Sequence, residues 1–428
     1  MGGGGLMQLV AYGMQDVYLT GNSQITFFKN LYRRHTNFSC EAVEQTFQSN
    51  SKAFGNKLVA VISRNGDLLH RLWLEVEMPA ATGTMVPCSQ VGHALIKSAE
   101  VEIGGQRIDK IYGRFTHLWH KLSCKAEKEA GYELMTGNDG PAAFDANKVT
   151  VTKRKLYIPI NFFFSKGSAG AALPLIALQY HEVRVSIELA PVGEVLRQIA
   201  TGGAAIEAFS ATSIEMEAPP KLYSDFFYLD TDERRRFSQM SHEYLIEQLQ
   251  FTGAEHVDVK TSVTPLSMRL NFNHPTKAIY WTAETDNLLK MNPFHNGVAD
   301  DAIDYKKKVF DGELRGEKSQ NPIKSVQLQL NGHERFSARD GEYFTLCQSY
   351  QHHTRVPYDH QVGLYSFCLS PEEHQPSGAL NFSRIDNATL KLDFKAADVA
   401  ESRTVYVYAV NYNVLRILSG MGGLAFSN

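Results

Sequence analysis

The chain has 428 residues, of which 43% are hydrophobic and 21% are charged, and its formal net charge is -3. This length suits two all-β domains of roughly 200 residues each, and no stretch approaches the roughly 18 consecutive apolar residues of a membrane-spanning helix. The negative net charge argues against direct nucleic-acid binding, which basic surfaces normally mediate. Five cysteines without a CxxC spacing are typical of reduced thiols in a cytosolic protein.

The chain starts with Met-Gly-Gly-Gly-Gly, which lacks the charged start, apolar run and cleavage site of a signal peptide. We expect residues 1–26 to form a flexible arm, and myristoylation of Gly2 is disfavoured because Leu6 stands where that motif requires Ser or Thr. The basic and aromatic stretch 27–35 follows. It favours contact with protein over contact with nucleic acid, because the rest of the chain offers no basic field.

Three pairs of similar segments occur in the same order in the two halves of the chain. They are 65–76 and 273–281, 98–107 and 325–335, and 178–189 and 380–392. The second and third pairs carry one extra residue in the second copy, and in the third pair Leu189 aligns with Leu392. Such a repeat predicts two similar domains and favours a protein that tiles a surface over an enzyme.

Alternating β-branched, aromatic and polar residues predict strands throughout both copies. In the clearest case, Val183, Val185, Ile187 and Leu189 share one face of a strand. Three dipeptides beside such runs predict primed turns with positive φ: Asn65-Gly66, Gly104-Gly105 and Asn331-Gly332.

Two helices are predicted, both in connections between strands. Asp230 and Glu233 form a capping-box pattern, which predicts a short helix that ends before Ser241 and joins the two copies. Apolar residues at helical spacing predict a second helix within 112–133. The domains are therefore expected at 27–230 and 242–428, with a linker helix at 231–241. Long loops are predicted near 131–150, 191–213 and 284–320, where neither period holds.

No catalytic or metal-binding constellation stands out. The sequence has no GxSxG, HExxH, P-loop or GxGxxG motif. The close histidine pairs His117 with His120 and His352 with His353 lack further ligands at recognisable spacing, so we expect them to be structural or exposed. Three Asn-x-Ser/Thr triplets start at Asn37, Asn381 and Asn387. They are candidate glycosylation sites that a cytosolic chain would leave unmodified.

Nine segments carry motifs more specific than these patterns: residues 9–38, 62–67, 101–109, 173–182, 242–253, 269–276, 375–378, 381–390 and 413–423. Together they resemble the major capsid proteins of large icosahedral double-stranded DNA viruses, the nucleocytoplasmic large DNA viruses. The resemblance is strongest to the algal type found in chlorella viruses and other phycodnaviruses. It spans nearly the whole chain.

The resemblance implies a double jelly roll, in which two eight-stranded antiparallel β-sandwiches follow one another with a short connecting helix. In the family, three chains form a homotrimer with a pseudo-hexagonal outline, and these capsomers tile the icosahedral shell of the virion. The resemblance also implies no enzymatic activity, no cofactor and no metal. Synthesis and assembly would take place in the host cytoplasm.

The N-terminal arm resembles segments that lie on the inner side of the shell. There it would contact minor capsid and penton proteins and, in relatives, an internal viral membrane. The residues expected to carry this contact are Tyr12, Gln15, Asp16, Phe27, Phe28, Arg33 and Arg34. Two other classes of function remain open from the sequence: a carbohydrate-binding, lectin-like jelly roll and a metal-dependent cupin-like enzyme.

Overall fold

The computed structural model describes residues 3–83, 85–87, 91–137, 144–145, 148–151, 153–199, 206–208, 214–257, 265–285, 321–357, 362–395 and 403–427. The chain separates into two units, Met1–Asn37 and Phe38–Asn428. The first unit contains the helices α1 (Gly4–Val10) and α2 (Val17–Thr20), and neither helix buries a residue. This unit therefore has no core of its own.

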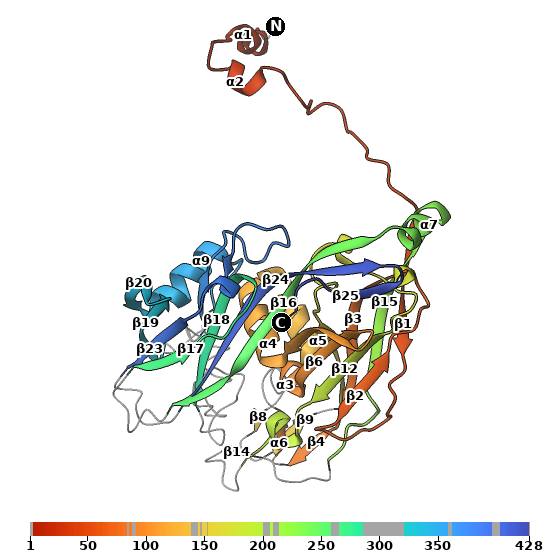
Figure 1. The fold of residues 1–428 in the computed structure, drawn as a ribbon, viewed down its shortest axis with the longest axis vertical. Coiled ribbons are helices and arrows are strands. Elements are labelled where there is room, and N and C mark those ends of the chain that lie inside the picture. The colour runs from red at the N-terminus through yellow and green to blue at the C-terminus, as the bar shows by residue number, and fades with distance from the viewer. Residues whose placement is uncertain are drawn as a thin grey trace. The chain divides into compact units, whose positions relative to one another are not determined.

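The first half of the second unit is a sandwich of two antiparallel sheets (Figure 1). One sheet has the order β1 (Phe38–Gln45), β15 (Lys221–Leu229), β3 (Leu68–Met78), β10 (Arg154–Ile160), and the short strand β11 (Leu173–Pro174) also pairs with β3. The other sheet has the order β2 (Lys57–Val61), β12 (Val183–Leu189), β6 (Ile96–Ile103), β7 (Gln106–Tyr112). Apolar residues of both sheets fill one hydrophobic core.

The second half repeats this arrangement strand for strand. Its first sheet has the order β16 (His242–Val257), β24 (Arg403–Leu418), β18 (Pro275–Thr285), β21 (Gly363–Ser366), with β22 (Leu380–Asn381) on β18 and β25 (Met421–Leu424) on β24. Its second sheet has the order β17 (Leu266–Arg269), β23 (Ala388–Phe394), β19 (Ile323–Leu330), β20 (His333–Asp340). In chain order this is the jelly-roll connectivity, made twice. The expected double jelly roll of two eight-stranded sandwiches is confirmed.

The three sequence repeats fall on equivalent strands: β3 and β18, β6 and β19, and β12 and β23. The alignment of the third pair was wrong by two residues. Val185 lies opposite Val101, and Leu390 lies opposite the equivalent residue Leu328. Leu189 therefore matches Phe394 and not Leu392, because the period of two along a strand lets a shifted alignment keep the same apolar face.

Two of the three predicted primed turns are confirmed. Gly104 and Gly105 have φ of 58° and 82°, and Asn331 and Gly332 have φ of 49° and 81°. The prediction for Asn65-Gly66 was wrong, because neither residue has positive φ. Gly66 is needed there for space, since a Cβ atom would lie 2.5 Å from Cβ of Phe226.

The linker helix is α7 (Thr231–Gln239), and the Asp230 carboxylate caps it by accepting the Thr231 N–H at 2.8 Å. The helix predicted within 112–133 is two helices, α4 (Gly113–Ser123) and α5 (Ala126–Thr136). They separate at Cys124 and Lys125, which have extended backbone angles. Helical spacing alone could not place this break, because the sequence there contains neither Gly nor Pro.

The loop predictions near 131–150 and 191–213 were partly wrong, since these segments contain regular elements. Residues up to Thr136 belong to α5, and short strands form two additional three-stranded sheets. These strands are β4 (Ala81–Gly83), β5 (Met85–Pro87), β8 (Phe144–Asp145), β9 (Lys148–Val151), β13 (Leu196–Ile199) and β14 (Ile206–Ala208). The predicted loop near 284–320 lies almost wholly outside the described residues.

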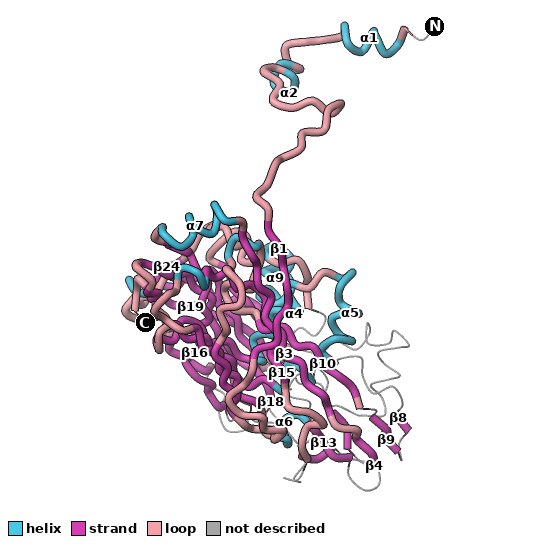
Figure 2. Tube along the Cα trace, turned by 90° about the vertical axis from the view of Figure 1, so that its right-hand side faces the viewer, coloured by secondary structure: helices cyan, strands magenta, loops and turns pink. Residues whose placement is uncertain are grey.

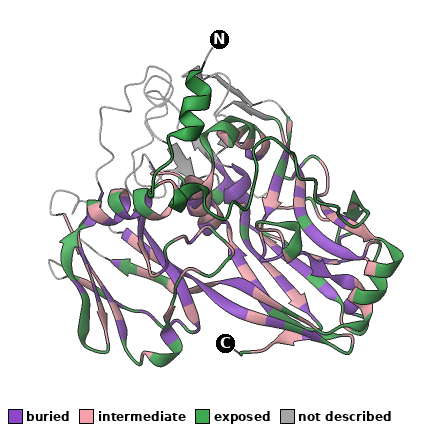
Figure 3. Ribbon diagram, turned by 90° about the horizontal axis from the view of Figure 1, so that it is seen from above, coloured by how far each residue is buried: buried purple, intermediate pink, exposed green. Residues whose placement is uncertain are grey.

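The remaining short helices are α3 (Val91–Leu95), α6 (Val192–Val195), η1 (Ala169–Ala171), η2 (Leu175–Ala177), η4 (Tyr343–Cys347), α9 (Gln348–His352) and η5 (Phe382–Arg384). Each jelly roll has its own hydrophobic core, and a third core lies between the rolls. The buried segments run along the strands of both rolls (Figure 3). No described helix is long and apolar enough to cross a membrane.

Candidate assembly surfaces

The outer face of the first sheet of the second roll is covered by the first roll. At its centre Tyr280 of β18 lies opposite Tyr408 of β24, and each is only 1% exposed. Helix α4 covers this pair: the Phe115 ring lies 5.7 Å from that of Tyr280 and 5.5 Å from that of Tyr408. The two rolls are therefore joined by a packed aromatic core.

Polar contacts supplement this joint. The Gln248 side-chain amide donates to the Ile108 carbonyl and accepts from Asn413 at 2.9 Å. Burial raises the pKa of Asp109, which accepts from the Leu249 N–H, to about 6. At the margin, the Arg114 guanidinium stacks 4.4 Å from the ring centre of Tyr406.

The first roll has an equivalent outer face on its own first sheet, whose strands lie side by side in Figure 2. Leu69 pairs with Leu173 of β11, as Thr276 pairs with Leu380 of β22. Four residues further along each strand stand Trp73 and Tyr280.

Trp73 lies opposite Tyr223, as Tyr280 lies opposite Tyr408. Both aromatic side chains of the first roll remain partly exposed. Charged residues surround them at the neighbouring outer positions: Glu44, Arg71, Lys221 and Asp225.

The pairing register shifts at one point along β3 and at the equivalent point along β18. The two rolls carry different buried side chains at that point. In the second roll this group is Lys277, which has no exposed surface and whose Nζ lies 2.7 Å from Glu247 Oε1. Burial works against ionisation of Glu247, but the His374 hydrogen bond and the positive charges of Lys166 and Lys277 prevail and lower its pKa to about 2. In the first roll the position belongs to His70, whose ring Nδ1 lies 2.8 Å from the Phe164 carbonyl oxygen.

The predicted histidine pairs have structural surroundings. His120 stacks on Tyr132 at 3.8 Å, and His93 Nε2 lies 2.7 Å from the Tyr132 hydroxyl. His117 is buried near His93, at a ring distance of 5.6 Å. His353 Nδ1 lies 2.8 Å from Glu372, and His352 Nδ1 lies 2.9 Å from the Leu369 carbonyl. Among the described residues, no group of three or more His, Cys, Asp or Glu could hold a metal ion.

The arm residues singled out from the sequence lie on the surface of the N-terminal unit. Phe27 is 88% exposed and Phe28 is 97% exposed. Asp16 is partly buried, and its carboxylate accepts the Gly13 N–H at 2.8 Å. The other four residues are exposed: Tyr12, Gln15, Arg33 and Arg34. The structure does not bring these side chains together into one site.

The three candidate glycosylation sites are exposed. The Asn381 side-chain oxygen accepts the Ser383 N–H at 3.0 Å, and the Ser383 hydroxyl accepts the His274 N–H at 2.8 Å. The Asn387 backbone N–H donates to the side-chain oxygen of Asn331 at 3.0 Å. Asn37 ends the N-terminal unit.

Comparison with known proteins decides the family. The model described as major capsid protein N-terminus matches residues 26–230, and the model described as large eukaryotic DNA virus major capsid protein matches residues 233–423. The major capsid protein of Pyramimonas orientalis virus is 46% identical, with all of both chains covered. This chain belongs to the major capsid proteins of large eukaryotic DNA viruses.

Other members of the major capsid protein family agree. The protein of Paramecium bursaria Chlorella virus 1 is 40% identical over 99% of this chain and all of its own. A chain of the PBCV-1 virus capsid quasi-atomic model superposes with a TM-score of 0.75 at 35% identity, covering 94% of this chain and 100% of that one. The Faustovirus major capsid protein, 12% identical with a TM-score of 0.70 and coverage of 95% and 94%, shares the fold. The resemblance is confirmed, and the carbohydrate-binding alternative is not favoured.

Sequence reasoning missed the uncovered aromatic pair Trp73 and Tyr223. The signal was present, because Trp73 alternates with Arg71 and Glu75 on the polar side of its strand. A large aromatic residue on a strand face that is otherwise charged is typical of a contact between chains.

Proposed function

We propose that three copies of this major capsid protein form a capsomer with a pseudo-hexagonal outline, and that these capsomers tile the icosahedral shell of a virion. The observation that carries the proposal is the duplicated jelly roll with matching strand order in both halves. A trimer of a doubled domain presents similar edges in six directions, so nearly the same contact can be repeated across a plane. The capsid names of full-length relatives support the role.

The chain would divide into an arm at 1–26, a first roll at 27–230, a linker helix at 231–241 and a second roll at 242–428. We assign the arm to the inner side of the shell, in contact with minor capsid and penton proteins and an internal viral membrane. Support comes from the composition of the arm and the stretch that follows it: more than half of the large apolar side chains that are exposed in the described chain belong to residues 6–32. Exposed apolar segments without a core are suited to order on docking.

The shell role requires no catalysis and no cofactor, and we propose neither for this chain. Assembly would take place in the host cytoplasm, where the cysteines stay reduced. The four described cysteines are free, as this proposal requires.

Light scattering on the purified full chain tests the proposal directly. We expect a species three times the mass of the chain, held by interfaces of the obligate class that bury more than about 2,000 Å². A monomer that persists at micromolar concentration would contradict the trimer.

Deletion of residues 1–26 separates the arm from capsomer formation. We expect the truncated chain to remain trimeric but to fail in particle assembly, as seen by electron microscopy of coexpressed capsid components. Loss of the trimer would instead place the arm between the chains of one capsomer. Intact-mass measurement on protein from virions tests modification at Asn37, Asn381 and Asn387.

A further inference from the structure

Each chain has two surfaces that take no part in the joint between its own two rolls. In the joint, α4 of the first roll covers Tyr280 and Tyr408 of the second. The equivalent face of the first roll, centred on Trp73 and Tyr223, stays partly exposed in the part of the chain that the structure describes. The equivalent of α4 in the second roll should then be the missing cover.

That equivalent is the helical segment 341–352, which contains η4 and α9. Ser98 pairs with Tyr112 just before α4, and Ser325 pairs with Asp340 just before this segment. Both helical segments begin with a glycine that lies against the first residue of an equivalent strand, β6 in the first roll and β19 in the second. A Cβ atom on Gly113 would lie 2.1 Å from the Ile96 carbonyl oxygen, and one on Gly341 would lie 2.2 Å from that of Ile323.

This helical segment has an unused face. Phe344, Thr345, Gln348 and Ser349 are buried against the second roll. The other face carries residues that are partly or fully exposed: Tyr343, Leu346, Cys347 and Tyr350. Tyr350 is 80% exposed. On α4, the face at this position packs against the neighbouring roll through Phe115, Leu118, Trp119 and Leu122.

The residues at the edge of the internal joint also have equivalents at the edges of the two open surfaces. In the internal joint, Arg114 follows Gly113 and stacks on Tyr406. The equivalent residues at the open surfaces are Glu342, which follows Gly341, and Lys221, which lies two residues before Tyr223 as Tyr406 lies before Tyr408. A cation-aromatic contact within the chain is thus replaced by two opposite charges that could pair between chains, in addition to their contacts within one chain, Lys221 with Glu44 at 3.1 Å and Glu342 with Lys395 at 3.8 Å.

We propose that the exposed face of 341–352 in one copy packs on the Trp73 and Tyr223 pair of a second copy. This inference rests on the proposed trimer and names the contact that would hold it. The two surfaces lie on opposite sides of the second unit: β1 and β15 at one side, and β19, β20 and α9 at the other (Figure 1). A head-to-tail contact of this kind closes into a ring when its rotation permits.

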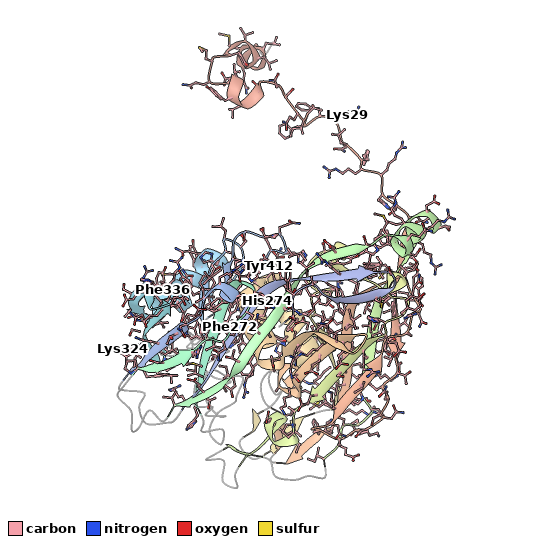
Figure 4. The ribbon with its side chains drawn as sticks, in the orientation of Figure 1. Lys29, Phe272, His274, Lys324, Phe336 and Tyr412 are labelled. Atoms are coloured by element: carbon pink, nitrogen blue, oxygen red, sulfur yellow. The ribbon has the colours of Figure 1, made fainter. Side chains whose placement is uncertain are left out.

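The contact would also cover two exposed edge strands. In the internal joint β7 approaches β16, as the Gln248 to Ile108 hydrogen bond shows. The equivalents are β20 and β1, and β20 buries only Phe336 (labelled in Figure 4) while most of β1 is exposed. Long exposed edges invite pairing with another chain.

A disulfide experiment uses the native thiol of Cys347. In the internal joint the ring centres of Trp119 and Tyr280 lie 6.1 Å apart. Trp119 lies on the face equivalent to that of Cys347, and Tyr280 is the equivalent of Trp73. The variant Trp73→Cys should therefore form a bond with Cys347 of the next copy under mild oxidation. We expect covalent trimers on non-reducing gels, with the 73–347 linkage found by peptide mass spectrometry.

Two controls define the result. The double variant Trp73→Cys with Cys347→Ser should give no covalent trimer, and Lys57→Cys on the other sheet, whose side chain is 55% exposed and so more accessible than Trp73, should give none. A protein that is trimeric by light scattering yet forms no 73–347 bond would overturn the contact and leave the trimer standing. A wild-type protein that is monomeric would overturn both.

Charge exchange tests the same contact without touching the aromatic residues. Lys221→Glu should lower the trimer association constant at least several-fold, because it places an acidic group opposite Glu342 of the next copy as well as beside Glu44 of its own chain. Adding Glu342→Lys should restore most of the loss. Equal effects of the single and double variants would overturn the pairing, and circular dichroism of both variants confirms that they fold.

Discussion

The outer sheet faces of the two jelly rolls occupy the same position in the fold but have different surroundings. In the second roll the central aromatic pair is closed under α4 and is ringed by apolar residues. In the first roll the matching pair is half-buried and ringed by Glu44, Arg71, Lys221 and Asp225. A face that is covered as the chain folds can be apolar throughout, whereas a face that must stay soluble until assembly keeps an aromatic centre within a polar rim.

The largest expected difference between the rolls lies at Lys277 and its counterpart His70. Lys277→Met should lower the free energy of unfolding by about 3–5 kcal/mol, because Glu247 would be left buried without its cation. His70→Phe removes one hydrogen bond and should cost only about 1–2 kcal/mol. Urea unfolding measures both values.

Glu247 supplies the control for that experiment. The double variant Lys277→Met with Glu247→Gln should recover part of the lost stability, because the unpaired charge is removed. If the single and double variants are equally unstable, packing of the lysine stem would be the dominant contribution.

The two aromatic centres should respond differently to truncation. Phe115→Ala leaves a cavity in the joint between the rolls. It should lower the free energy of unfolding by about 3–4 kcal/mol at any protein concentration. Trp73→Ala should barely change the unfolding of the dissociated chain but should weaken its association. Unfolding measured over a hundredfold range of concentration distinguishes the two, and a concentration-independent loss for Trp73→Ala would remove the distinction between the faces.

Acid should act beside the covered joint, because His93 and His120 pack with Tyr132 among α3, α4 and α5. Burial and nearby positive charge lower the pKa of His93 to about 3, and burial is also the main cause that lowers the pKa of His120 to about 4. The unfolded chain takes up these protons below about pH 6.5, so the stability these neutral rings provide is complete above that pH and is lost as the pH falls toward 4. The loss at pH 4 is on the order of 3 kcal/mol for each ring.

Thermal unfolding between pH 7.5 and 4 checks this dependence. His120→Gln should show a shallower loss of stability with falling pH than the wild type. His333→Gln changes an exposed residue of the β20 hairpin and serves as the control. An unchanged slope in His120→Gln would assign the acid sensitivity to other groups.

The smallest effects are expected at the matched turns. Gly105→Ala strains a positive φ in open space and should cost about 1 kcal/mol. Gly104→Ala should cost more, because its Cβ atom would lie 2.4 Å from His181 Nδ1, which binds the backbone of Gly422. At the equivalent turn, Asn331→Gly relieves a positive φ but removes the side-chain oxygen that accepts the Asn387 N–H, so it should cost about 0.5–1 kcal/mol. Similar costs at Gly104 and Gly105 would show that the His181 contact adds nothing.

The strands and both jelly rolls could be predicted because alternation and the repeat leave a clear record in the sequence. The exact register of the third repeat could not, since a shift of two residues preserves the apolar face. The break between α4 and α5 at Cys124 and Lys125 was also hidden, because neither residue is a helix breaker. The family, by contrast, was evident from motifs near both ends of the chain.

Assembly surfaces were the hardest to predict, for a physical reason. Whether Trp73 or Tyr280 is covered depends on which roll lies beside it, although Trp73 stands between Arg71 and Glu75 along its strand and Tyr280 between Ala278 and Thr282. Only the register of both sheets reveals that they are counterparts. The arm residues remain a prediction from the resemblance.

The packed core between the rolls sets the angle between them before any other chain arrives. Side chains from α4, β18 and β24 fill it, so the joint is not a hinge. In the proposed trimer each copy would thus bring one of the two alternating corners of the capsomer already formed, and assembly would create only the other. The angle between neighbouring rolls could then vary at three corners of the outline and not at six. This suits a shell whose flat faces depend on the shape of every capsomer.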